Sequence, residues 1–263
     1  MNKKKKVDII GRIPAWTWTV LSLLTAVVVW GMLSNGEVTG RAFPPLVEVF
    51  GSYKKMAVAR GVFWSDIGSS LISAGVGFAL GFVLGVPVAF LMAWYRPVRN
   101  IIEPWIQFIR NIPPLAYVPL VVIAAGVGRT PQIIVICIAT FLTISITVFQ
   151  GVINVDETLI KAARVLGAND SVLFRKVIFP ATTPFIITSI RLGISVALTT
   201  LIAAESTGTN AGLGMRIRAL SSTFETQPMM LYIIVVGVIG MLAEKILKFF
   251  ERRLTSWQEK REV

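Results

Sequence analysis

Runs of about 20 mostly apolar residues recur along this chain, and they limit what it can fold into. A stretch of that length, wound as a helix, crosses the hydrocarbon core of a bilayer, which is about 30 Å thick. Charged residues make up 15% of the 263 residues, whereas a soluble domain carries roughly 25%. Helices satisfy their own backbone hydrogen bonds inside lipid. The sequence therefore predicts an all-α, polytopic membrane protein.

The apolar runs predict six transmembrane helices in a single domain that covers residues 1–263. The first run follows four consecutive lysines and shows no clean cleavage pattern, so we interpret it as a retained signal anchor. Apolar residues three and four apart predict an amphipathic surface helix over residues 46–60, with Val47, Phe50, Tyr53 and Ala57 on its apolar face. The predicted spans are residues 16–33, 69–94, 101–125, 133–152, 184–204 and 229–250, and a glycine-rich polar connection is expected over residues 205–228.

Two of these spans carry unusual residues. Gly77, Gly81 and Gly85 recur every four residues in the second span, so one helix face lacks side chains and favours close packing with a neighbouring helix. The third span is interrupted by Arg110, Pro113 and Pro114 and their neighbours. Broken backbone at membrane depth is tolerated only inside protein or beside a cavity. We therefore expect residues 110–114 to be either part of a translocation pathway or a hinge near the cytoplasm.

The distribution of positive charge predicts the orientation of the chain. The formal net charge is +12, which we assign to topology and contact with anionic membrane lipid, not to nucleic acid. With the N-terminus inside, the inner segments hold 17 Lys and Arg residues and the outer segments hold 7. The excess predicts that both termini lie in the cytoplasm. It also places the polar, basic loop at residues 156–180 inside the cell.

This cytoplasmic loop has the signals of two short helices. Asp156 and Glu157 precede a helical run, where negative charge suits a helix N-terminus, and Gly167 is suited to end that run. Residues 169–171 are suited to cap a second helix through Lys176. Pro180 is expected to mark the boundary to the fifth span. The loop is too small to hold an active site, so we expect it to dock another protein.

The order of residues in this loop resembles the coupling loop of ABC importer membrane subunits. In that family the pattern is Glu-Ala-Ala, three residues, Gly, nine residues, Ile, one residue, Leu-Pro. Here Lys161 stands in place of Glu, Phe179 in place of Leu, and the spacing from Gly to Ile is one residue longer. The resemblance implies that the loop docks on a separate ATPase subunit, through Lys161, Ala162, Ala163, Gly167, Ile178 and Pro180.

The resemblance extends over roughly residues 43–257, through Phe43-Pro44-Pro45, the run from Arg110 to Leu120 and Gly212-Leu213-Gly214. These segments resemble the permeases of taurine, alkanesulfonate, nitrate and bicarbonate importers, which are binding-protein-dependent and of type I. The resemblance implies alternating access, a second permease copy, an extracytoplasmic solute-binding protein and an ATP-binding subunit dimer. It favours a small organic or inorganic anion as solute. Related permeases carry vitamin precursors or aromatic compounds, and this alternative stays open.

Missing motifs exclude other activities. The chain has no phosphate-binding loop of the Gly-x4-Gly-Lys-Ser/Thr type and no histidine, so it is not itself the ATPase and carries no histidine metal site. We therefore expect no cofactor or metal in this chain, with ATP and Mg²⁺ bound by the partner subunit. A secondary transporter would need carboxylates within its spans, and only Glu103 and Glu205, at span ends, are candidates.

Arg191 and Glu205 are the remaining candidate pathway residues. Arg191 lies in the fifth span, where it would attract an anionic solute or, alternatively, bond to helix ends and the interface. Glu205 closes that span and is expected at an outer gate or at the dock of the binding protein.

Overall fold

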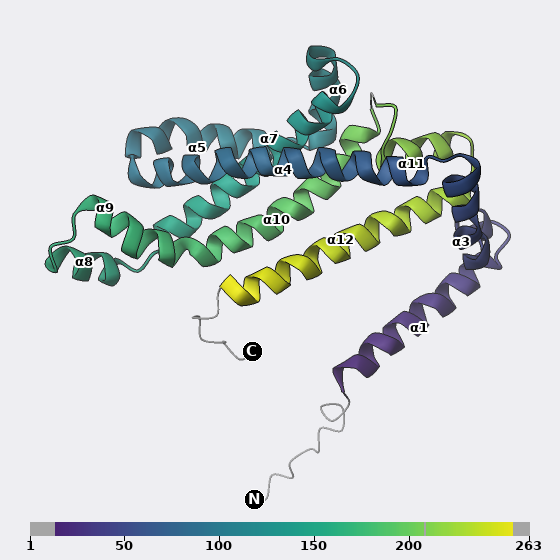
Figure 1. Ribbon diagram of the computed structural model, residues 1–263, viewed down its shortest axis with the longest axis horizontal. Helices are drawn as coiled ribbons and strands as arrows, with labels where there is room; N and C mark the ends of the chain where they lie inside the picture. Colours follow the sequence, from purple (N-terminus) through teal and green to yellow (C-terminus); the bar gives the residue numbers. More distant parts are fainter. Residues whose placement is uncertain (1–13, 208, 255–263) are drawn as a thin grey trace, which may run out of the picture.

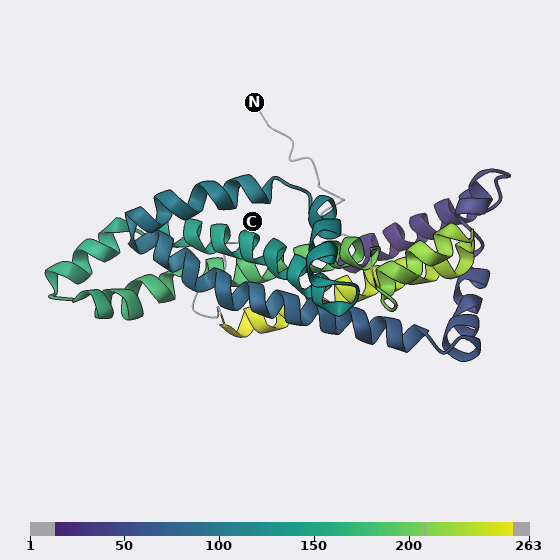
Figure 2. The same ribbon diagram turned by 90° about the horizontal axis from the view of Figure 1, so that it is seen from above.

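The computed structural model describes residues 14–207 and 209–254, and every regular element within this part is helical. The predicted lysine-rich start and the last residues of the basic tail lie outside it. The long helices run roughly side by side, with α8 and α9 at one extremity and α3 at the other (Figures 1 and 2). The helices are α1 (Ala15–Ser34), α2 (Thr39–Ala42), α3 (Leu46–Lys54), a π-helical turn (Lys55–Ala59), α4 (Phe63–Trp94), α5 (Arg96–Arg110), α6 (Pro114–Ala125), α7 (Arg129–Ile153), α8 (Glu157–Val165), α9 (Asp170–Leu173), a second π-helical turn (Phe174–Ile178), α10 (Phe179–Glu205), α11 (Leu213–Ser222) and α12 (Thr226–Leu254).

The described residues contain five helices that are long and apolar enough to cross a membrane, and α5 with α6 forms a sixth if the bent pair counts as one span. The bend between α5 and α6 is 103°. Pro113 precedes α6 and Pro114 is its first residue. The helix breaks here because proline disfavours a helical conformation in the residue before it and lacks the N–H that would continue the helix. The predicted interruption at residues 110–114 is confirmed.

Helices α4, α7 and α10 form the centre of the bundle, and α7 packs against both others. Gly77, Gly81 and Gly85 lie buried on the face of α4 that meets α7. The helices approach so closely that the Thr140 hydroxyl reaches the Gly77 carbonyl at 3.5 Å and the Ser145 hydroxyl donates to the Gly85 carbonyl at 3.3 Å. The predicted role of these glycines in helix packing is confirmed.

The predicted helix at residues 46–60 is present, and its other side, for which the sequence made no prediction, packs against protein. Val49 and Met56 are fully buried, and α3 packs against α12. Val47 and Phe50, placed on the apolar face by the sequence pattern, are 85% and 57% exposed. The helix carries apolar residues on both sides, so the spacing could not decide which side meets protein. Helix α1 stands apart from the bundle (Figure 1).

Two predicted boundaries are wrong, and one predicted connection contains a helix that was not predicted. Helix α4 begins at Phe63, six residues before the predicted start of its span. Pro180 does not separate the loop from the fifth span, because α9, the π-helical turn and α10 follow one another without a break. Proline is tolerated in the first turn of a helix, where its missing N–H has no partner to lose. The glycine-rich connection at residues 205–228 contains a helix of its own, α11.

Candidate functional site

The loop between α7 and α10 projects beyond the bundle at one end (Figures 1 and 2), and its two short helices are capped by side chains. The Asp156 carboxylate accepts a hydrogen bond from the Thr158 N–H at 2.7 Å, and this bond lowers the pKa of Asp156. The Asn169 side chain accepts from the Val172 N–H at 2.9 Å, at the start of α9. Such caps satisfy amides that the helix itself leaves unpaired.

Gly167 fixes the turn between α8 and α9. Its φ is +81°, and its N–H donates to the Arg164 carbonyl at 3.0 Å while the Ala168 N–H donates to the Ala163 carbonyl at 3.0 Å. This is the Schellman arrangement, which needs a residue in the left-handed conformation. The Arg164 guanidinium adds an ion pair with Asp170, across the turn. The predicted role of Gly167 as the end of the first loop helix is confirmed.

The tip of the loop exposes apolar side chains outside the bundle. Val165 and Leu166 are 87% and 86% exposed, and Ala162 is also exposed. Lys161 forms an ion pair with Glu157 at 2.8 Å, and this pairing raises the pKa of Lys161 and lowers that of Glu157. The tip therefore presents exposed apolar side chains next to Lys161, whose positive charge is balanced by Glu157 of the same helix.

Ile178 and Pro180 do not share this exposed tip. Ile178 is buried, and Pro180 lies exposed in the first turn of α10. Between the tip and α10, the Phe174 ring packs edge-on against Phe90 and Trp94 of α4, with ring centroids 5.1 and 6.0 Å apart. This contact ties the loop to α4 as well as to α10.

The bend between α5 and α6 borders a cavity of about 300 Å³ that α7 and α10 complete. Arg110, the last residue of α5, lines this cavity together with Pro114, while Pro113 lies exposed beside it. Within the part of the chain that the structure describes, Arg110 forms no ion pair, and its one hydrogen bond is a long one of 3.4 Å to the Gln107 side chain. The structure thus brings Arg110 and Pro114 together at a cavity.

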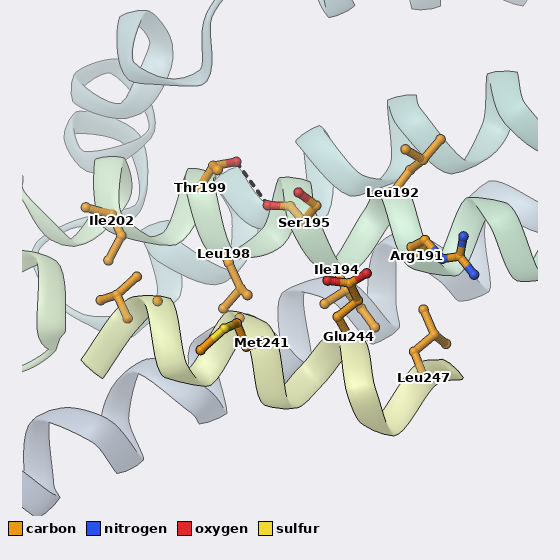
Figure 3. Close-up of a pocket in the computed structure, with 13 residues that line it drawn as sticks. Arg191, Leu192, Ile194, Ser195, Leu198, Thr199, Ile202, Met241, Glu244 and Leu247 are labelled. Carbon is orange, nitrogen blue, oxygen red and sulfur yellow. Dashed lines mark hydrogen bonds between the residues drawn. The ribbon is translucent and has the colours of Figure 1, made fainter. Parts of the chain in front are cut away.

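Arg191 lies elsewhere. It borders a second cavity of about 770 Å³ between α10 and α12, whose walls are mostly apolar. Figure 3 shows Leu198 and Met241 facing each other across this gap, with Arg191 toward one end. The Arg191 guanidinium pairs with Glu251 of α12. Arg191 therefore links two helices, as in the structural alternative that the sequence left open.

Glu205 is fully buried at the opposite end of α10. Its carboxylate accepts hydrogen bonds from the Ser70 hydroxyl at 2.6 Å and from the Gly214 N–H at 2.8 Å. The Ser70 oxygen in turn accepts from the Leu213 N–H at 2.9 Å. A Cβ at Gly212 would lie 2.4 Å from the Glu205 carboxyl carbon, so the glycine lets the backbone approach. Glu205 thereby caps the start of α11.

A buried ion pair next to Glu205 was not predicted. Asp66 of α4 is 1% exposed and accepts from Arg216 Nε at 2.8 Å and from the Tyr232 hydroxyl at 3.0 Å. The sequence indicated only Glu103 and Glu205 as carboxylates near the spans. Asp66 was missed because its predicted span began too late and because its partners lie 150 and 166 positions away. The one sequence signal for Asp66 is that an acidic residue stands within an apolar stretch.

The described residues contain no group of three or more His, Cys, Asp or Glu side chains that could hold a metal ion. The α8–α9 loop and the bend between α5 and α6 offer two other kinds of site. One is a surface for docking a protein, and the other is a cavity with an unpaired cation.

Residues 81–256 match the family described as binding-protein-dependent transport system inner membrane component. This chain belongs to that family. It is 44% identical over 201 residues to a probable ABC transporter permease protein of Brucella abortus (strain 2308), covering 76% of this chain and 80% of the relative. It is 31% identical over 246 residues to the taurine transport system permease protein TauC of Escherichia coli (strain K12), covering 92% and 90%. It is 26% identical over 250 residues to the nitrate import permease protein NrtB of Leptolyngbya laminosa, covering 92% and 88%.

The fold is similar to that of solved ABC transporters. A chain of an amino acid ABC transporter crystallised with histidines superposes with a TM-score of 0.65 at 21% identity, covering 76% of this chain and 98% of that chain. The predicted all-α permease fold is confirmed. The chain is a multi-pass membrane permease of the ABC importer class, a membrane subunit and not an ATPase.

Proposed function

We propose that this permease imports a small organic or inorganic anion of the taurine, sulfonate and nitrate class, and that a separate subunit supplies the energy from ATP. The family and the relatives named above support the class of transporter. The capped, exposed tip of α8, at the end of the bundle, is the observation that carries the proposal. It has the form of a docking element and stands on a rigid support.

The partners follow from this proposal. A dimer of ATP-binding subunits, which holds ATP and Mg²⁺, contacts the tip through Lys161, Ala162, Ala163 and Gly167. Ile178 and Pro180 hold the loop where it joins α10. A second permease copy completes the pathway, and an extracytoplasmic binding protein delivers the solute. Both termini then lie in the cytoplasm, on the side of the α8–α9 loop, as the charge distribution predicts.

Coupling by this loop needs a stiff connection, and the contacts supply one. The two helix caps, the Schellman turn and the ion pair of Arg164 fix the shape of the loop. The packing of Phe174 against α4 then carries a displacement of the tip into the bundle. Closure of the ATP-bound motor would move the tips inward and open the bundle outward, and hydrolysis would reverse the change. Packed interfaces of this kind switch between discrete arrangements.

The solute class follows from charge. Arg110 sits unpaired beside the broken span, whereas Arg191 is neutralised by Glu251. A cation within a membrane span is costly unless it serves a bound or passing partner, and an anion is the natural one. An importer of vitamin precursors or aromatic compounds would not need this unpaired charge.

The test is reconstitution of the permease with its ATP-binding subunit and binding protein in proteoliposomes. We expect ATP-dependent uptake of taurine, an alkanesulfonate or nitrate. Uptake driven by an ion gradient without ATP would overturn the proposal in favour of a secondary transporter.

Variants of Gly167 separate coupling from assembly. Gly167→Val should abolish uptake and the ATPase stimulation by the loaded binding protein, because a β-branched residue resists a φ of +81°. Gly167→Asn should retain most of both, since asparagine tolerates this conformation. No described side chain lies within 4 Å of the position of an added Cβ, so crowding of the Cβ does not explain a difference. Equal activity of the two variants would refute the coupling role of this turn.

A further inference from the structure

We propose that the cavity at the bend between α5 and α6 is an anion-binding site on the translocation pathway, with Arg110 and Tyr117 as its donors. The inference rests on the proposed function and deepens it, because it assigns the solute's negative group to named atoms. The ligand class is a small oxyanion: a sulfonate, a carboxylate or nitrate.

The first observation is the unused hydrogen-bonding capacity of Arg110. A guanidinium has five N–H donors in a planar fork that matches two oxygens of a carboxylate, sulfonate or nitrate. In the described part of the chain only one of these donors has a partner, at 3.4 Å. The residue lines the cavity, and its side chain is exposed. The remaining donors are available to a bound anion.

A second donor set lies across the bend, on α6. Tyr117 lines the same cavity, and its hydroxyl has no hydrogen-bond partner among the described residues. Pro114 also lines the cavity and is the first residue of α6, so the amide of Leu115 belongs to the first turn and has no acceptor within the helix. The first amides of α6 are therefore available as further donors, while the opposed dipole ends of α5 and α6 at the bend leave Arg110 as the main source of positive charge.

The cavity walls suit a small anion. The lining residues from α7 and α10 include three threonines, Thr143, Thr199 and Thr200, and the lining set contains no Asp or Glu. A volume of about 300 Å³ is at the lower limit of the range for ligand pockets, roughly 300–1,000 Å³. A small solute fits this space, and a large cofactor or peptide does not.

The position along the bundle also fits. Helix α5 starts at the end of the bundle that carries the α8–α9 loop (Figure 2). Arg110 is 14 residues beyond Arg96, which is about 21 Å along a helix, within a hydrocarbon core of about 30 Å. With Arg96 at the cytoplasmic boundary, where the charge distribution of the sequence places it, the site lies inside the transporter, where an anion needs a counter-charge. Arg191 offers none, since Glu251 neutralises it.

The local potential can be measured without knowing the solute. Cys137 is the single cysteine of the chain, so Thr143→Cys in a Cys137→Ser background places one thiol in the cavity. In the purified full-length permease, the rates of its modification by anionic sulfonatoethyl and cationic trimethylammonium-ethyl methanethiosulfonate are compared. We expect Arg110→Gln to lower the anionic-to-cationic rate ratio by at least about fivefold, the effect of one unit charge within about 8 Å even at the dielectric constant of water.

Two controls and a ligand-protection experiment complete the test. Arg129→Gln removes an exposed arginine that does not line the cavity, and the rate ratio should stay unchanged. Taurine and nitrate are each added at about 10 mM, because the Debye length is still about 30 Å at this ionic strength and the charge of Arg110 is little screened. Both should slow modification of the thiol, and choline should not. The protection by taurine should be weaker in Tyr117→Phe and absent in Arg110→Gln.

An unchanged rate ratio in Arg110→Gln, or equal protection by taurine and choline, overturns the assigned site. These readouts need neither ATP nor the partner subunits. They therefore fail independently of ATP-dependent uptake, which tests the proposed function itself.

Discussion

Replacing Gly81 by alanine should destabilise the bundle at the contact of α4 with α7. The Cβ of the new side chain would lie 2.0 Å from Thr140 Oγ1 and 2.9 Å from the backbone nitrogen of Phe141. Contacts below 3.0 Å cannot persist, so an atom must move. The threonine side chain can rotate, but its hydroxyl then loses the 2.7 Å bond to the Ile136 carbonyl. The backbone of α7 can yield only by separating the helices.

The cost follows from these two adjustments. Overpacking of a well-packed interior costs typically 1–3 kcal/mol, and losing the hydroxyl's bond adds about 0.5–1.5 kcal/mol. The higher helix propensity of alanine returns up to about 1 kcal/mol. We expect a net loss of about 2 kcal/mol, which lowers the ratio of folded to unfolded protein by about 30-fold.

Thermal and denaturant unfolding of the purified permease in detergent would measure this loss. Gly75→Ala is the matched control, since Gly75 lies exposed on the same helix and its Cβ would meet nothing within 4 Å. Thr140→Ala in the Gly81→Ala background should recover part of the stability, because the 2.0 Å contact disappears while the backbone contact stays. The packing argument is refuted if Gly81→Ala is as stable as Gly75→Ala, or if the second substitution makes no difference.

Two further predictions concern the end of the bundle with α3 and α11. Asp66→Asn should lower the unfolding free energy by about 1.5–3 kcal/mol, because it weakens the charge-assisted hydrogen bonds of Arg216, whose side chain is 19% exposed, and removes its counter-charge; a melting curve like that of wild type would contradict this. Glu225 pairs with Lys55 and Arg60, which lower its pKa, so its stabilisation is present above the unfolded pKa of about 4.3 and is lost as the pH falls through the lower folded value. The stability difference between wild type and Glu225→Gln, at most about 1 kcal/mol for an ion pair of this exposure, should be constant from pH 8 to about pH 5 and shrink below about pH 4. A difference that grows on acidification would have the wrong sign.

The sequence predicts features whose cause is local. The four-residue spacing of Gly77, Gly81 and Gly85 specifies a bare helix face, and Pro113 with Pro114 breaks a helix whatever surrounds it. Gly167 ends α8 because its own backbone reaches a φ of +81° without strain. These features needed no knowledge of distant contacts.

Features that depend on distant contacts were missed. Helix α11 carries Leu213, Ile217 and Leu220 at helical spacing, but it is short, and its start is held by carboxylates from α4 and α10. The buried side of α3 is chosen by α12, whose Tyr232 packs in the same cluster as Val49 and Met56. The spacing of apolar residues on α3 is the same whichever side is buried, so no pattern within the helix could decide it.

Helices α4 and α10 are joined by polar contacts at one end and by aromatic contacts at the other, and this limits where the bundle can move. Ser70 and Glu205 join α4 to α10 near α11, while Phe174 and Phe179 pack on Phe90 of α4 near the loop. Between these ends, α7 packs closely on both helices at glycines where an added Cβ would lie within 3.3 Å of neighbouring atoms. A displacement of the loop should therefore move α4, α7 and α10 as one body. The change in shape then has to occur where packing is loose, at the 103° bend beside Arg110 and across the 770 Å³ gap between α10 and α12.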